Sequence, residues 1–368
     1  MKKLLFSAVT LDVGGIETAL VRLLNYLADQ KNNGKYKYEI TLVLEKKQGL
    51  FLHSLDSRIK IIEYAPSNDK IVFIRKATNF LKQQLFKFIH GNKYDFSCSY
   101  ATYSNSGAFV ARTASRNSTL WCHMDYLAMF GENENKVKEF FEEKQYDKFK
   151  NIVFVSERSK ETFLHVFPNA RNKTIHINNW IDYNKILDLA EEKASDLQPK
   201  EDVTTFINIG RHYEDQKKLS RILEAAKILK DENKKFRIVF VGDGRDTKQY
   251  YDLVRKYDLK EYVIFLDRKK NPYPYLKMSD CTILTSDYEG YPVVFVESMV
   301  LNKPIITTNV SGVEAIEQNG YAIVTEKDAE SIAFAMKTFI EEGFEIQNKF
   351  DAQKYDDEIT EKLEKLMN

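Results

Sequence analysis

Residues 204–244 read TTFINIGRHYEDQKKLSRILEAAKILKDENKKFRIVFVGDG. Two apolar runs, Thr204–Ile209 and Phe236–Val241, each end at a glycine, and the segment Leu219–Lys230 between them predicts a helix. A strand, a helix and a second strand in this order form the repeating unit of a parallel sheet covered by helices. We therefore expect an α/β fold in this part of the chain.

The same alternation continues in both directions from this stretch. In the second half, a helix is predicted at Lys248–Tyr257 and strands at Val263–Leu266, Cys281–Thr285, Pro304–Thr307 and Ala322–Val324. In the first half, a helix is predicted at Ile16–Asp29 and strands at Leu4–Val9, Glu39–Leu44, Ile59–Glu63, Phe96–Tyr100, Thr119–Cys122, Ile152–Val155 and Thr174–Ile177. The charged segment Asp188–Asp202 between the halves suits a helix followed by a linker. The sequence thus predicts two doubly wound parallel-sheet domains with a cleft between them.

The composition is that of a globular protein of about two domains. The chain has 368 residues, and 55 Lys and Arg against 54 Asp and Glu give a net charge of +1, which argues against a grossly basic nucleic-acid-binding protein. The three cysteines form no C-x-x-C pair, so neither a disulfide framework nor a cysteine zinc site is expected. The apolar run Leu4–Val9 is short for a signal peptide, and no stretch approaches the ~18–20 apolar residues of a membrane-spanning helix. We expect a cytoplasmic protein.

Glycine turns follow several of the predicted strands, at Gly14-Gly15, Gly210-Arg211 and Gly242-Asp243-Gly244. Because α/β proteins bind ligands beyond the carboxyl ends of their strands, these turns should lie at the ligand-binding edges. Gly14-Gly15 also precedes a helix N-terminus, which favours an anion. It is not the full dinucleotide fingerprint, and taken alone it is equally compatible with a tight turn.

Two cations near the second of these turns are candidates for binding a diphosphate. Arg211 and Lys217 lie six residues apart on one predicted loop, and an arginine fork with a lysine neutralises phosphate charge well. Taken in isolation, the same pair is more typical of solvated loop charges than of a diphosphate site.

The segment 286–299, SDYEGYPVVFVESM, adds two carboxylates to that edge. Glu289 ends a loop, and Glu297 lies in a helix predicted to begin near Pro292. Glu297 shares that helix with apolar neighbours and needs a polar partner, for which a ribose diol is suitable. Gly290 permits close approach of the backbone to a ligand.

These carboxylates and the intervening EGYPVVFVE resemble the E-x7-E motif of retaining glycosyltransferases of the GT-B fold, family GT4. Six more stretches resemble family segments in the same order along the chain: Gly14-Gly15-Ile16-Glu17, Trp121-Cys122-His123-Met124-Asp125, Val155-Ser156-Glu157 with Asn179-Trp180-Ile181-Asp182, Arg211 with Lys217, Gly242-Asp243-Gly244, and Asn302-Lys303-Pro304-Ile305. The resemblance implies two Rossmann-like domains facing a central cleft. An acceptor-side domain would span 1–183, a donor-binding domain 184–349, and a C-terminal helix at 350–368 would pack back on the first domain.

The resemblance also implies a role for individual residues. The catalytic candidates are His123, which would contact the donor sugar across the cleft, and Glu289, which would bind the hydroxyls of that sugar. Six residues would bind other parts of the donor or leave room for it: Gly15, Arg211, Lys217, Gly290, Tyr291 and Glu297. Among these, Arg211 and Lys217 would hold the pyrophosphate, and Glu297 would accept the ribose hydroxyls.

The implied activity is retaining transfer of a hexose or N-acetylhexosamine from a nucleotide sugar, expected to be UDP-linked, to a saccharide or lipid-linked saccharide in bacterial polysaccharide or glycoconjugate synthesis. No D-x-D metal motif occurs in the chain, and Arg211, Lys217 and a helix N-terminus can stabilise a departing diphosphate by themselves. We expect no metal and no cofactor. Acceptor groups are expected around Tyr100–Ser106 and Asp125–Phe130.

Three residues depart from the family pattern, each where glycine is usual. Lys218 follows Lys217, Asn302 begins the N-K-P-I stretch, and Asp267 follows the strand Val263–Leu266. Lys218 puts the shape of its loop in doubt. Asp267 lies near the expected base pocket, so guanine stays open as an alternative to uracil.

The segment 70–94 contains six Lys and Arg and no Asp or Glu. Ile74, Ala77, Leu81, Leu85 and Phe88 fall on one face of a helix. Two interpretations remain possible for this helix. It lies on the anionic inner face of the cell membrane, or it packs its apolar stripe against its own domain.

Two other functions fit parts of this pattern. A nucleotide-sugar epimerase of similar fold would need further acid and base carboxylates that the sequence does not identify. A non-catalytic partner subunit would be expected to lack His123 or one of the two glutamates, and all three are present. A nucleic-acid reader is disfavoured because segment 70–94 lacks a recognisable reader motif.

Overall fold

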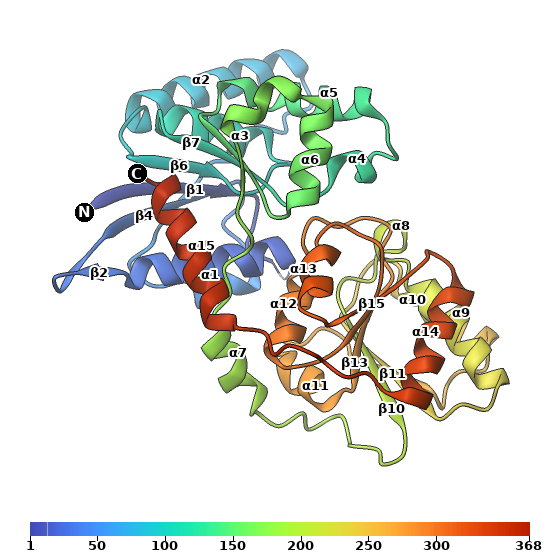
Figure 1. The fold of residues 1–368 in the computed structure, drawn as a ribbon. Helices are drawn as coiled ribbons and strands as arrows, with labels where there is room; N and C mark the ends of the chain where they lie inside the picture. Colours follow the sequence, from blue (N-terminus) through green and yellow to red (C-terminus); the bar gives the residue numbers. More distant parts are fainter. Residues whose placement is uncertain (13) are drawn as a thin grey trace. The chain divides into compact units, whose positions relative to one another are not determined.

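The computed structural model describes residues 1–12 and 14–368. They form two compact units (Figure 1). Unit 1 comprises Met1–Ile181 together with Asp357–Asn368, and unit 2 comprises Asp182–Asp356. The first crossing of the chain between the units therefore comes two residues before the expected boundary at 183.

Unit 1 is built on a seven-stranded sheet in the order β5-β4-β1-β6-β7-β8-β9. Its strands are β1 (Lys2–Ala8), β4 (Tyr38–Leu44), β5 (Lys60–Glu63), β6 (Phe96–Ser99), β7 (Ser118–Cys122), β8 (Asn151–Phe154) and β9 (Thr174–His176). Every neighbouring pair is parallel. A separate two-stranded hairpin joins β2 (Lys31–Asn32) to β3 (Lys35–Tyr36). All seven strands predicted for this half are confirmed, with ends shifted by one or two residues.

Helices cover the sheet of unit 1. They are α1 (Gly15–Asp29), α2 (Val72–His90), α3 (Asn105–Ala114), α4 (Tyr126–Met129), α5 (Glu134–Glu143) and α6 (Glu157–Val166), with the 3₁₀ turns η1 (Leu50–Ser54), η2 (Tyr146–Lys148) and η3 (Pro168–Lys173). The last helix, α15 (Ala352–Leu366), also contacts this unit. Its Thr360 hydroxyl lies 3.1 Å from that of Tyr26, and its Glu364 accepts a 2.8 Å hydrogen bond from Lys37.

Unit 2 is built on a six-stranded parallel sheet in the order β12-β11-β10-β13-β14-β15. The strands are β10 (Thr204–Ile209), β11 (Phe236–Val241), β12 (Val263–Phe265), β13 (Cys281–Leu284), β14 (Ile305–Thr308) and β15 (Ala322–Thr325). The helices are α7 (Tyr183–Ala190), α8 (Glu214–Lys217), α9 (Leu219–Asp231), α10 (Thr247–Lys256), α11 (Tyr273–Met278), α12 (Val293–Val300), α13 (Val313–Gln318) and α14 (Ala329–Glu342). The doubly wound fold predicted for both halves is confirmed.

The strands of unit 2 are largely apolar because both faces of its sheet are covered. Phe206 of β10 belongs to the core cluster that includes residues of α9, α10 and α14. The next residue, Ile207, belongs to a second cluster that includes residues of α11. Successive side chains of a strand point to opposite faces, so this alternation places a helix layer on each side.

The prediction for Asp188–Asp202 was wrong about the helix. The helix α7 lies earlier, at Tyr183–Ala190, and 191–203 contains no helix or strand. Asp182 accepts a 3.2 Å hydrogen bond from the Lys185 amide and caps α7. The charges that suggested a helix instead form surface ion pairs, such as Asp196 with Lys269 at 2.5 Å.

Candidate active site

In unit 2 the strand order reverses between β10 and β13, and the loops that follow these two strands lie at the carboxyl edge of the sheet. In open α/β sheets this switch point is where ligands bind. The loop after β10 carries Arg211 and Lys217, and the loop after β13 carries Glu289 and Gly290. The structure therefore brings the two predicted cations and the Glu289 carboxylate to adjacent loops.

Lys217 and Glu289 are in direct contact. The Lys217 ammonium donates to Oε1 of Glu289 at 2.6 Å, and the two side chains are 17% and 8% exposed. Glu289 also accepts hydrogen bonds from the Ser286 hydroxyl at 2.7 Å and the Gln216 amide at 3.4 Å. The carboxylate is therefore ion-paired, hydrogen-bonded and fixed in one orientation.

Arg211 is in a different state from Lys217. Its side chain is exposed, and within the described residues it forms no hydrogen bond or ion pair. Gly210 precedes it, and a β-carbon added there would lie 4.0 Å from the Lys217 side chain. In the described part of the chain, the loop thus carries one exposed, unpaired cation at Arg211 and one paired cation at Lys217, whose side chain passes close to Gly210.

Glu297 lies on α12 and is buried, with 6% of its surface exposed. The Tyr273 hydroxyl on α11 donates to its Oε1 at 2.8 Å. The predicted ribose contact is thus an interaction that Glu297 would make in addition to, or in place of, the one to Tyr273.

The helix α12 begins directly after Gly290 and Tyr291. It starts at Val293 with Pro292 at its N-cap, and within the described residues no side chain caps it. The first amide groups of such a helix remain available to an anion. Tyr291 itself is buried, and burial raises the pKa of its hydroxyl. Its ring also packs on Gly312, where an added β-carbon would approach the ring to 2.6 Å.

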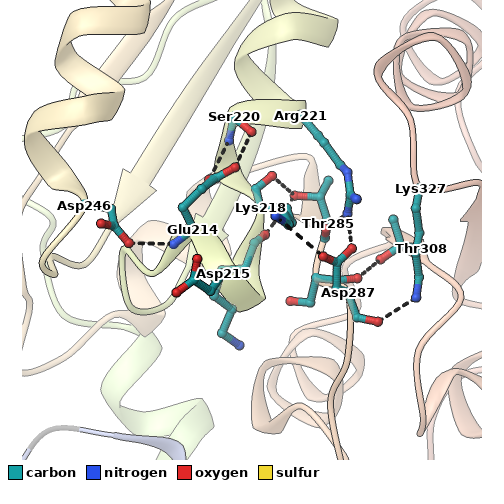
Figure 2. Close-up of polar contacts among 12 residues, drawn as sticks. Glu214, Asp215, Lys218, Ser220, Arg221, Asp246, Thr285, Asp287, Thr308 and Lys327 are labelled. Atoms are coloured by element: carbon teal, nitrogen blue, oxygen red, sulfur yellow. Dashed lines mark hydrogen bonds and ion pairs between the residues drawn. The ribbon is translucent and has the colours of Figure 1, made fainter. Parts of the chain in front are cut away.

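A polar network holds the two loops together (Figure 2). Asp287, in the loop after β13, accepts a 2.7 Å hydrogen bond from Arg221 of α9 and lies 3.7 Å from the Lys218 ammonium. Its backbone amide donates to the Gln216 carbonyl at 2.8 Å, and the Thr285 hydroxyl donates to the Lys218 carbonyl at 2.9 Å. These bonds keep the Lys217 segment against the Glu289 loop.

Two further contacts tie the same network to neighbouring strands and helices. The Lys327 ammonium donates to the Asp287 carbonyl at 2.6 Å, and the Thr308 hydroxyl donates to the Ser286 carbonyl at 2.6 Å. On the other side, Glu214 at the start of α8 accepts from Tyr250 at 2.9 Å, and its amide donates to Asp246 at 2.8 Å. The loops that carry Lys217 and Glu289 are thus supported by the rest of unit 2.

The three residues that stand where the family usually has glycine all have left-handed backbones. Lys218, Asp267 and Asn302 have φ angles of 49°, 51° and 55°. Glycine adopts this region without steric cost, whereas other residues do so at a cost. Lys218 thus adopts a backbone conformation that glycine favours.

In unit 1, His123 follows β7 and is 7% exposed. Its ring lies 4.5 Å from the Tyr100 ring, and burial lowers the pKa of the imidazole to about 3. Among the described residues nothing bonds its buried Nε2 atom. His123 is therefore a neutral imidazole with one nitrogen available for a hydrogen bond.

Gly15 begins α1, and Gly14 is its N-cap without a side-chain cap among the described residues. Glu17, in the first turn, accepts a 3.3 Å hydrogen bond from the half-exposed Tyr103. The regions expected to hold acceptor groups are partly occupied by structural contacts. Glu45 accepts hydrogen bonds from Ser104 and Ser106.

Asp125, in the other expected acceptor region, caps α4 by accepting a hydrogen bond from the Ala128 amide at 3.2 Å, and it also accepts one from the Thr162 hydroxyl at 3.1 Å.

The residues that the sequence analysis missed are the uncharged partners of the glutamates, namely Gln216, Ser286 and Tyr273. Ser286 lies three residues before Glu289 and was within reach of sequence reasoning. Tyr273 lies 24 residues before Glu297, and no local pattern connects them.

Comparisons with known proteins find glycosyltransferases among the relatives and the structural neighbours. Residues 190–357 match the family model described as "Glycosyl transferases group 1". An uncharacterized glycosyltransferase of Methanocaldococcus jannaschii is 29% identical over 169 residues, which are 45% of this chain and 41% of that protein. An N-acetylgalactosamine-N,N'-diacetylbacillosaminyl-diphospho-undecaprenol 4-alpha-N-acetylgalactosaminyltransferase of Campylobacter jejuni is 24% identical over 350 residues, 93% of this chain and 91% of that protein.

The chain spans 41 to 49% of the length of the first three curated relatives that it matches. Over almost its whole length it shares a fold with the Anabaena protein HepE, crystallised with UDP-glucose. The TM-score is 0.76 at 17% identity, covering 99% of this chain and 100% of that one. The two parallel sheets and the HepE match show a fold of the GT-B type, and residues 190–357 are similar to the group 1 glycosyltransferases.

Proposed function

We propose that the protein transfers a hexose or N-acetylhexosamine, with retention and without a metal, from a UDP-linked donor to a saccharide or lipid-linked saccharide. The HepE structure contains UDP-glucose, which supports a uridine donor. The name of the Campylobacter relative includes a lipid-linked diphospho-undecaprenol acceptor, which supports the proposed acceptor class.

The observation that carries the proposal is the asymmetry of charge at the switch point of unit 2. Arg211 is exposed and unpaired among the described residues, while Lys217 is held on Glu289 at 2.6 Å. A diphosphate bound to Arg211 would also approach the Lys217 ammonium, and the sugar attached to it would then reach Glu289. In this proposal Lys217 contacts the diphosphate of the donor, and Glu289 contacts the sugar attached to it.

The same geometry bears on the stereochemistry. Both oxygens of Glu289 accept hydrogen bonds, so this carboxylate is suited to binding hydroxyls rather than to attacking an anomeric carbon. We therefore assign same-face substitution. The bond from the anomeric carbon to the diphosphate oxygen breaks, the acceptor oxygen bonds from that face, and its proton passes to the departing diphosphate. Arg211, Lys217 and the α12 amides stabilise the negative charge that develops.

We assign His123 a hydrogen-bonding role toward the donor sugar. Burial lowers its pKa to about 3, so at neutral pH the imidazole is uncharged and does not serve as an acid. Its unbonded Nε2 is the atom that would contact a sugar hydroxyl or the acceptor.

Calorimetric titration of the purified protein with UDP, GDP, ADP, dTDP and CMP, with and without EDTA, tests the donor class. We expect UDP to bind in both conditions and Arg211→Ala to weaken it about tenfold or more, because charged hydrogen bonds contribute about 1.5–3 kcal/mol. Arg255→Ala, on α10, is the matched control. Tighter binding of another nucleotide would overturn the uridine assignment, and loss of binding in EDTA would overturn metal independence.

Turnover separates an enzyme from a binding subunit. Incubation with radiolabelled UDP-sugars and a lipid-linked saccharide pool should give a labelled product whose new linkage is α when the donor is α. UDP binding without any labelled product, across hexose and N-acetylhexosamine donors, would indicate a non-catalytic partner subunit instead.

A further inference from the structure

The helix α2 of unit 1 presents its apolar residues outward. Nine of the 17 large apolar side chains that are exposed in the described part of the chain lie between 71 and 89. Phe73, Leu81 and Phe88 are 81%, 67% and 82% exposed. The alternative in which this stripe packs on its own domain is therefore wrong.

The inner face of α2 is mostly polar. Phe86 is the one buried side chain of α2, all of whose residues are described, and it packs on Tyr64 and Phe109. Beside it, the Asn79 side chain accepts a 2.7 Å hydrogen bond from the Ser67 amide, and Lys82 donates to the Ala65 carbonyl at 2.9 Å. Surface helices of globular proteins ordinarily show the reverse arrangement, with the apolar face inside. These contacts hold α2 with its apolar face outward.

Cations border this face. At about 100° per residue, Lys76 and Lys87 fall along one edge of the apolar arc and Arg75 along the other. No acidic residue occurs from Lys70 to Tyr94. A second copy paired through the same face would bring these like charges together, which opposes self-association.

We propose that α2 docks unit 1 on an anionic lipid bilayer, with Phe73, Leu81 and Phe88 entering the region between headgroups and acyl chains. Aromatic and aliphatic residues on one face with flanking Lys and Arg are the composition of helices that lie in this interface. No helix in the described part of the chain combines the length and apolarity needed to cross a bilayer. Docking on the surface is therefore the mode that α2 supports. The proposal does not depend on the donor or on the reaction.

Flotation of the intact protein with lipid vesicles tests the proposal. Vesicles of phosphatidylcholine containing about one third phosphatidylglycerol should carry the protein upward, and those of phosphatidylcholine alone should carry about tenfold less. Added salt should weaken the binding to anionic vesicles. No flotation with anionic vesicles, or equal flotation with both kinds, would overturn the proposal.

Matched variants locate the binding surface. Phe88→Ser should lower partitioning by about tenfold, because it removes a fully inserted ring. Phe334→Ser, on α14, removes a side chain that is 72% exposed and should leave partitioning unchanged. Lys76→Glu with Lys87→Glu should abolish the preference for anionic vesicles, whereas Lys256→Glu on α10 should keep it. Circular dichroism checks that each variant is folded.

Two outcomes would reject α2 as the membrane surface. An equal loss of flotation in Phe88→Ser and Phe334→Ser would assign binding to general hydrophobicity. A concentration-dependent dimer in sedimentation that Phe88→Ser dissociates would assign the face to a second copy of the chain.

Discussion

The edges of the two sheets hold their candidate residues in opposite electrostatic states. In unit 2, Lys217 and Glu289 form a nearly enclosed ion pair, and Arg211, in the same loop as Lys217, is exposed. In unit 1, His123 is buried against the Tyr100 ring, and its low pKa keeps it neutral. The edge of unit 2 is thus suited to binding charged groups, and the edge of unit 1 is suited to a neutral hydrogen bond.

The strongest test of the charged edge is Glu289→Gln. Amide and carboxylate have the same shape, but the amide lacks the charge that orients sugar hydroxyls, so turnover should fall by about 10³-fold. The fold should persist, because the flexible Lys217 can turn to solvent. Steady-state kinetics with the preferred donor measures the effect, and Glu342→Gln at the end of α14 is the control. Turnover like that of the wild type would remove Glu289 from the site.

The next largest effect is expected on stability. Lys217→Ala leaves the enclosed Glu289 carboxylate without its cation, and breaking such a pair costs about 3 kcal/mol. Urea unfolding followed by circular dichroism measures this loss. Adding Glu289→Gln to Lys217→Ala should restore most of it, because the double variant has no unpaired charge. If the double variant instead loses as much free energy of unfolding as the two single variants together, Lys217 and Glu289 are not coupled.

A pH series tests the neutral edge. Unfolded His123 titrates near its ordinary pKa of 6.5 and folded His123 near 3, so unfolding takes up a proton between these values. The free energy of unfolding therefore falls as the pH falls below 6.5, by up to about 1.4 kcal/mol per pH unit from this group. His123→Asn should remove that part of the slope.

Tryptophan fluorescence suits the measurement, since Trp121 and Trp180 both belong to unit 1. The burial of His176 lowers its pKa too, to about 4, but that residue is present in both proteins and cancels in the comparison. His53→Asn, at an exposed position, is the control. An unchanged slope in His123→Asn would mean that His123 is charged in the folded protein.

The smallest effect is expected at Lys218, in the loop of the charged edge. Its φ of 49° costs a lysine about 1 kcal/mol relative to glycine, and its 3.7 Å contact with Asp287 offsets part of that cost. Lys218→Gly should therefore raise the free energy of unfolding by somewhat less than 1 kcal/mol. Asn302→Gly should instead lower it, because asparagine tolerates this conformation and its Oδ1 accepts a 2.9 Å hydrogen bond from the buried Tyr321 hydroxyl. A loss of stability in Lys218→Gly would show that its ammonium contributes more than its backbone costs.

The strands and the charged edge of unit 2 could be predicted from the sequence, because each has a local physical signature. Continuous apolar runs such as Phe236–Val241 identify strands that are buried on both faces, and the glycines after them mark the carboxyl edge. Parallel pairing of β10 with β13 then brings Lys217 and Glu289 together although 72 residues separate them. The partners of the glutamates were not reached, because contacts such as Tyr273 with Glu297 depend on how α11 and α12 pack.

The direction in which the apolar face of α2 points also could not be predicted from the periodicity of its apolar residues. A periodic pattern identifies an apolar face but does not say whether that face turns inward. Here Asn79 and Lys82 fix the answer through bonds to the loop at Ala65 and Ser67. These are side-chain contacts to irregular backbone, which no helical pattern encodes.

The route of the chain gives unit 1 a particular order of assembly. Its last segment, Asp357–Asn368, follows all of unit 2 in the sequence. During translation, which proceeds from the N-terminus, the 182–356 region is complete before Thr360 and Glu364 can reach Tyr26 and Lys37. Unit 1 is therefore the earlier part of the chain to be synthesised and the later one to be finished.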